Sequence, residues 1–171
     1  MGARLPAWGV AVAAVVAVPA GDTAVAQDAR PRIVVDVSLK KEVVVRDPQG
    51  REHVTLEEVT SSGPGDTLVY RIHYVNRGEA PAVNPRVVDP VPPGTELVPG
   101  SWDTEGADFS VSVDGGRTFH PYPVRRTVTQ PDGASSIQEV ALSSYTHVRW
   151  TCREPLAPGD ARSAVFKVKV R

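Results

Sequence analysis

The chain has 171 residues, with 19 basic and 20 acidic side chains and a formal net charge of −1. This even balance gives no electrostatic basis for binding nucleic acid or an anionic membrane surface. A single cysteine, Cys152, excludes an intramolecular disulfide, so the fold must be held by its core.

Residues 1–26 have the three parts of a bacterial export signal. Arg4 supplies a short basic start, residues 8–18 are apolar, and Ala24 and Ala26 are the small residues of a cleavage site. We predict cleavage before Gln27. The alternative, an uncleaved membrane anchor, is disfavoured because the apolar stretch is shorter than the roughly 20 residues that span a bilayer and is interrupted early, at Pro19, Gly21 and Asp22.

Residues 27–32 form a polar lead, and residues 33–171 are predicted to form one domain. The odd positions from 33 to 45 are mostly apolar, which predicts a strand with one buried face. Lys41 interrupts this pattern and predicts a bulge or a crossing between sheets. A turn signal at 47–50 precedes a second, weaker strand at 53–59.

The clearest strand lies within residues 64–101. Apolar side chains alternate there with Arg71 and His73, and turn-forming residues bound the strand on both sides. The alternating apolar residues are Leu68, Tyr70, Ile72 and Tyr74.

The rest of the chain repeats this design. A hairpin is expected over 108–120, a strand over 124–129 and a loop over 130–136, followed by strands over 148–152 and 164–170. Short strands with turn signals every 8 to 12 residues predict an all-β fold, either a sandwich or a barrel, and we favour an antiparallel β-sandwich of about 7 to 9 strands preceded by a signal peptide.

Two segments resemble a known family. They are GDTLVYRIHYVNRGEAPAVNPRVVDPVPPGTELVPGS at 65–101 and THVRWTCREPLAPGDARSAVFKVKV at 146–170, with a looser match over 33–45. They are similar to the domain of unknown function 11 family, also called the conserved repeat domain. The resemblance implies an immunoglobulin-like module of exported or envelope-associated bacterial proteins, without catalytic residues. Residues 102–145 fit the family pattern less well and form a less regular insert.

A second motif lies inside the insert. The run SVDGGRTF at 112–119 resembles the Asp-box hairpin of sialidase-like propellers, in which the aspartate carboxylate accepts hydrogen bonds from turn amides. A single copy cannot form a propeller. We therefore interpret Asp114, Gly115 and Gly116 as a structural turn.

No set of residues predicts catalysis. The four histidines lack the close spacing of a zinc site, no serine lies in a G-x-S-x-G elbow, and Cys152 shares its strand face with Val148 and Trp150, as expected of a buried, unreactive thiol. We expect no catalytic residue, no metal ligand and no cofactor.

The candidates for partner binding lie in the insert. Trp102, beside a turn, is either a core residue or a contact residue. The acidic residues near it favour a solvated face over a calcium site because they lack a dedicated loop spacing. The full candidate set is Trp102, Asp103, Glu105 and Asp108, together with Pro131 and Asp132 in the second loop.

We therefore expect a non-catalytic structural or interaction module, periplasmic or extracellular. It would bind an envelope protein or a surface polymer through sandwich loops or an edge strand. We expect no nucleic-acid partner, no transmembrane segment after cleavage, and a monomer. The alternatives are a hydrolytic or carbohydrate-active enzyme with a site assembled from distant residues, and a small carbohydrate-binding domain, which would expose coplanar aromatic rings.

Overall fold

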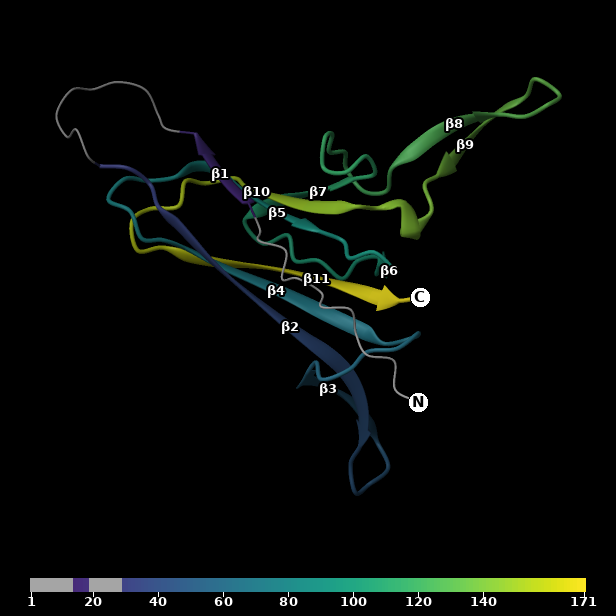
Figure 1. Ribbon diagram of the computed structural model, residues 1–171, viewed down its shortest axis with the longest axis horizontal. Helices are drawn as coiled ribbons and strands as arrows, with labels where there is room; N and C mark the ends of the chain where they lie inside the picture. The colour runs from purple at the N-terminus through teal and green to yellow at the C-terminus, as the bar shows by residue number, and fades with distance from the viewer. Residues whose placement is uncertain (1–13, 19–28) are drawn as a thin grey trace.

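The fold is a β-sandwich of two antiparallel sheets (Figure 1). The structure is a computed structural model that describes residues 29–171 and the backbone of residues 14–18. The predicted all-β antiparallel sandwich is confirmed, and the only helical element among these residues is a short 3-10 turn at Leu142–Ser144. The strands are β1 (Ala14–Val18), β2 (Ile33–Arg46), β3 (Glu52–Glu58), β4 (Thr67–Asn76), β5 (Val83–Pro90), β6 (Thr95–Leu97), β7 (Ala107–Ser112), β8 (Arg125–Thr129), β9 (Ser135–Glu139), β10 (His147–Cys152) and β11 (Ala161–Val170).

The strand order shows how the chain fills the two layers. One sheet has the order β1-β5-β10-β7 and the other the order β3-β2-β4-β11-β6, while β8 and β9 form a separate hairpin. The predicted insert at 102–145 supplies β7, which pairs along its whole length with β10. Part of the insert is therefore an integral strand of the sandwich.

The core lies where the inward faces of the two sheets meet. Ile72 of β4, Val87 of β5, Phe166 of β11 and Trp150 of β10 are almost completely buried. The Trp150 indole N–H donates to the carbonyl of Asp103 at 2.7 Å, so its polar atom is satisfied inside the core. Cys152 is also buried, as the alternation of its strand predicted.

The predicted bulge or crossing at Lys41 is wrong. β2 pairs with β4 in an unbroken register through Lys40 opposite Val69 and Lys41 opposite Leu68. Lys41 lies where β4 begins, and its amine reaches Asp66 at 3.5 Å in the preceding turn. Lys41 belongs to the face of β2 that points toward the other sheet. A lysine is tolerated there because the sandwich ends at this position and β2 continues beyond it.

The end of β4 is tied to the polar lead by Asn76, which is fully buried. Its side chain accepts N–H groups of Arg32 (3.1 Å) and Gly78 (2.9 Å) and donates to two carbonyls. Gly78 is required because a Cβ there would lie 2.2 Å from the carbonyl oxygen of Arg30. Residues 30–32 are therefore held against the β4–β5 turn.

The predicted signal peptide at 1–26 falls largely outside the described residues. Its segment Ala14–Val18 forms β1, which pairs antiparallel with β5 with Ala14 opposite Val88 and Val16 opposite Arg86. No helix in the described part of the chain is long and apolar enough to cross a membrane.

Candidate binding surface at one end of the sandwich

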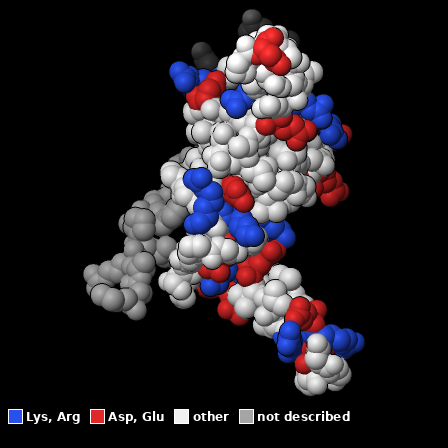
Figure 2. Space-filling model, turned by 90° about the vertical axis from the view of Figure 1, so that its right-hand side faces the viewer, with Lys and Arg blue, Asp and Glu red and all other residues white. Residues whose placement is uncertain are grey.

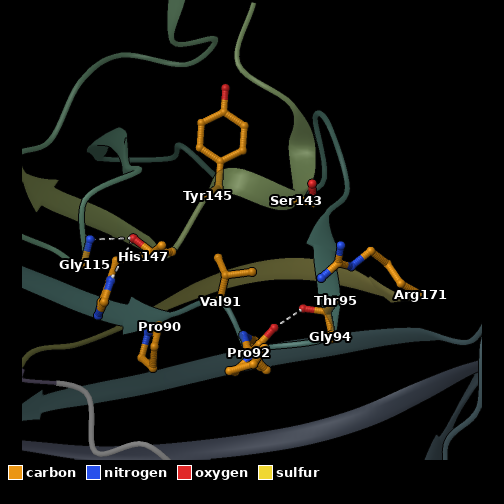
Figure 3. Close-up of a pocket in the computed structure, with 12 residues that line it drawn as sticks. Pro90, Val91, Pro92, Gly94, Thr95, Gly115, Ser143, Tyr145, His147 and Arg171 are labelled. Carbon is orange, nitrogen blue, oxygen red and sulfur yellow. Dashed lines mark hydrogen bonds between the residues drawn. The ribbon is translucent and has the colours of Figure 1, made fainter.

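The end of the sandwich at which β11 terminates carries a hollow of about 430 Å³ (Figure 3). Segments that are far apart in sequence converge there: the β5–β6 loop, the turn at 113–118, the segment leading into β10, and the last residue of the chain. The lining residues are Pro90, Val91, Pro92, Pro93, Gly94, Thr95, Gly115, Ser143, Tyr145, Thr146, His147 and Arg171.

One wall of the hollow is a rigid, mainly apolar loop. Three of its residues are prolines, whose rings fix φ. The Thr95 hydroxyl donates to the carbonyl of Pro92 at 2.7 Å, and the N–H of Arg171 donates to the carbonyl of Gly94 at 2.9 Å. The loop is thus closed on itself and fastened to the end of β11.

The opposite wall rests on the turn that resembles an Asp-box. The Asp114 carboxylate accepts hydrogen bonds from the hydroxyl groups of Ser112 and Thr118, both at 2.7 Å, and from the N–H groups of Arg117 and Thr118. Hydrogen bonds from Thr118, and then from Ser112, hold the pKa of the Asp114 carboxyl well below its usual range. Gly115 and Gly116 follow with positive φ values of 79° and 81°, which glycine adopts without strain.

His147 lies in the hollow beside this turn (Figure 3). Thr146 Oγ1 accepts the N–H of Gly115 at 3.0 Å and donates to the carbonyl of Ser112 at 3.2 Å. His147 Nδ1 lies 3.3 Å from Thr146 Oγ1, and the tautomer of the ring decides which of the two atoms donates. Burial lowers the pKa of His147 and so favours the neutral ring, while the negative charge of Asp114 acts in the opposite direction.

Within residues 29–171, no three His, Cys, Asp or Glu side chains gather in a way that would hold a metal ion.

Two hairpins extend from the same end of the sandwich and diverge from each other (Figure 1). The β2–β3 hairpin continues beyond the start of β4. The base of the β8–β9 hairpin is closed by a hydrogen bond from the Val140 N–H to the Val124 carbonyl. The Val124 N–H donates to the hydroxyl of Tyr145, which lines the hollow, and so connects this hairpin to it. Figure 2 looks onto this end and shows an uncharged area bordered by charged side chains, with a cluster of charged side chains and the charged tip of one hairpin below it.

Exposed apolar side chains concentrate on these hairpins. The described residues include five large hydrophobic side chains that are exposed, and four of the five lie on the hairpins. Val44 lies opposite Val54, and Leu56 shares their face two residues along β3, because alternate residues of a strand point the same way. The four are Val44 (62% exposed), Val54 (56%), Leu56 (44%) and Ile137 (74%).

The aromatic rings are arranged differently. Trp102 is half-buried and stacks on Phe109 with ring centroids 4.3 Å apart, and the edge of Tyr122 meets it at 4.7 Å. No phenylalanine, tyrosine or tryptophan of residues 29–171 is classed as exposed. The aromatic side chains therefore pack against one another.

The structure does not bring the sequence-predicted binding residues together. Asp103 and Glu105 border a separate shallow hollow with Arg162, and Asp108 is exposed and forms an ion pair with Arg153 at 2.9 Å. Pro131 and Asp132 occupy the exposed tip of the β8–β9 hairpin, where Asp132 accepts the N–H of Ala134. Of the predicted turn, Gly115 lines the larger hollow.

Sequence reasoning missed most of this end surface. The residues 130–136 were expected to be a loop, whereas Ser135 begins β9 and makes the region a projecting hairpin. His147 lies half-buried in the hollow, although no spacing in the sequence marks it as a site residue. The available signals were the proline cluster at 90–93 and the non-alternating placement of Val44 and Leu56.

Comparison of the chain with protein-family models, with curated proteins and with solved structures finds no match.

Proposed function

We propose that this protein is an exported binding module of the bacterial envelope that binds a partner protein through the two hairpins at the end of the sandwich that carries the hollow. The observation that carries the proposal is the placement of four of five exposed large apolar side chains on these two hairpins. Single exposed apolar residues are common on any surface, but their concentration at one end is typical of an interaction site.

The chemistry of this surface favours a protein over a carbohydrate polymer. Carbohydrate-binding sites commonly stack sugar rings on exposed aromatic side chains, whereas the hairpins present valine, leucine and isoleucine. Aliphatic side chains beside a proline-rich hollow complement apolar side chains of another protein. The resemblance to the domain of unknown function 11 family, an envelope-associated family, also supports this proposal.

The proposed location is periplasmic or extracellular, and it rests on the export signal in residues 1–26. N-terminal sequencing of protein recovered outside the cytoplasm tests it. We expect a chain that begins at Gln27. Recovery of a chain that begins at Met1 would contradict the proposed cleavage.

Copurification of partners with the tagged protein tests the binding site. We expect a double variant, Val54→Ser with Ile137→Ser, to lose partners that the unchanged protein retains, because it removes apolar contact from both hairpins. Val34→Ser is the matched control, since Val34 is exposed (44%) but lies at the beginning of β2, away from the hairpins. Equal loss of the partners from the control and the double variant would contradict the proposed site.

A further inference from the structure

Among the described residues, the edge of β5 is covered only by β1, which lies in the segment that cleavage of the export signal would remove. β5 pairs with β10 on one side and with β1 on the other. Cleavage before Gln27 would take β1 away and leave this edge of the sheet without a partner strand. The following inference rests on that proposed cleavage.

The backbone of β5 is arranged to accept a strand at this edge. The N–H of Val91 donates to the carbonyl of Thr146, so the residues of the same parity, Val87 and Asp89, direct their backbone groups towards β10. Arg86 and Val88 alternate with them and direct theirs towards β1. Without β1, the N–H and C=O groups of these two residues are free to pair.

The edge is short and has defined limits. Pro90 has no N–H and ends the ladder at one side, and proline is accepted at such edges because no donor is needed. At the other side, Asn84 has a positive φ of 49°, and the register of β1 shifts between Val16 and Val18. The acceptor site therefore matches a segment of about five residues, the length of β1.

A buried carboxylate lies on the inner face of this edge strand. Asp89 shares the inward parity of Val87 and Val91 and is only 2% exposed, yet its Oδ2 atom has no hydrogen-bond partner among the residues that the structure describes. Buried polar atoms are normally paired, and an unpaired one is expensive to maintain. A strand that extends one residue past the position opposite Val88 would place a side chain directly across from Asp89.

We infer that the edge of β5 in the processed protein accepts one extended antiparallel segment of a partner protein, apolar at alternate positions and carrying a lysine or arginine opposite Asp89. The apolar side chains of the segment would face the inner surface of the sandwich as an added strand. Its cationic side chain would pair with the Asp89 carboxylate.

Amide hydrogen exchange tests the acceptor edge on two forms of the protein, the full chain of 171 residues and the processed chain recovered from the exporting cells. We expect the amides of Arg86 and Val88 to exchange about tenfold faster or more in the processed chain. The amides of Val87 and Asp89, which face β10, are the internal control for folding. They should stay protected in both forms.

The probe for binding is a synthetic peptide with the sequence AVVAV and a solubilising tail at its C-terminal end. We expect it to restore protection at Arg86 and Val88 in the processed chain, and a peptide with proline at its third position to fail. Adding a lysine before AVVAV, opposite Asp89, should tighten binding about tenfold relative to an added alanine. Asp89→Asn in the protein should abolish that difference.

Several results would overturn the inference. Equal exchange of Arg86 and Val88 in both forms would mean that β1 does not cover the edge, and loss of protection at Val87 and Asp89 in the processed chain would make β1 an obligatory strand. Failure of the AVVAV peptide to protect the edge, or equal binding of the lysine and alanine peptides, would also contradict it. A chain that begins at Met1 after export would instead contradict the proposed cleavage, while the exchange of the full chain would still report whether β1 is seated.

Discussion

The two layers of the sandwich and the two hairpins that leave it follow opposite rules. In the sandwich, alternate residues such as Ile72 and Trp150 are removed from water almost completely. In the hairpins, Val54 and Ile137 have the same apolar chemistry and stay exposed. A strand with alternating sequence is buried only where a second sheet lies over it, and neither hairpin has such a cover within the described residues. The two sheets of the sandwich, called the frame below, bury their apolar side chains, whereas the hairpins leave theirs exposed.

The largest expected effect is in the frame. Trp150→Ala should destabilise the protein by about 3–5 kcal/mol, because it leaves a large cavity and removes the indole hydrogen bond to Asp103. Trp102→Ala, which removes a half-buried ring at the periphery, should have a clearly smaller effect. Urea denaturation measures both. An equal loss of stability in the two variants would contradict the division between core and periphery.

The next effect depends on pH. Burial raises the pKa of Asp89 to about 7 from its ordinary value of 3.8. Between pH 4 and pH 7 the Asp89 carboxyl loses its proton in the unfolded chain and keeps it in the native chain. Its contribution to the free energy of unfolding is therefore full below about pH 4 and is lost as the pH rises to about 7. With about 1.4 kcal/mol for each pKa unit, the loss is on the order of 4 kcal/mol.

Asp89→Asn sharpens this test because it keeps the shape and removes the charge. We expect the variant to be more stable than the unchanged protein at pH 8, with little difference at pH 4. Thermal denaturation across this range measures the effect. A difference that is largest at pH 4 would show that the sign is wrong.

Asn76→Ala should destabilise the protein by about 2–3 kcal/mol, since it leaves backbone groups of Arg32, Gly78 and Leu156 unpaired inside the fold. Hydrogen exchange should show the loss first at the β4–β5 turn. Glu79→Ala is the control, because Glu79 is exposed in the same β4–β5 turn. If the control produced the same local opening, the role assigned to Asn76 would be wrong.

The smallest effect on stability is expected in the hairpins. Val54→Ser and Ile137→Ser should each change the free energy of unfolding by less than about 0.5 kcal/mol, because both side chains are exposed. Urea denaturation tests this expectation. A loss above about 2 kcal/mol would mean that the hairpins are part of the frame.

The alternation of apolar and polar residues predicted the two sheets because, in a two-layered sandwich, every second residue of a strand faces the other sheet and is buried. Tyr74 and Phe166 are buried where their parity placed them. The same rule cannot tell where a strand continues past its partner, so it misread Lys41, although the strand predicted over 33–45 matches β2 in length. The end surface depends on which loops meet in space. The closeness of Gly115, His147 and Arg171 follows from strand order, which no single segment encodes.

Site-specific photocrosslinking in living cells tests most directly whether the hairpin end holds a partner protein. A photoreactive residue is placed in turn at Val54, at Ile137 and at Ala157, an exposed position in the turn before β11 at the opposite end. The two hairpin positions should give adducts of the same mass, and Ala157 should give none. Adducts from Ala157 that match those from the hairpins, or no adducts from either hairpin, would contradict the proposed binding surface.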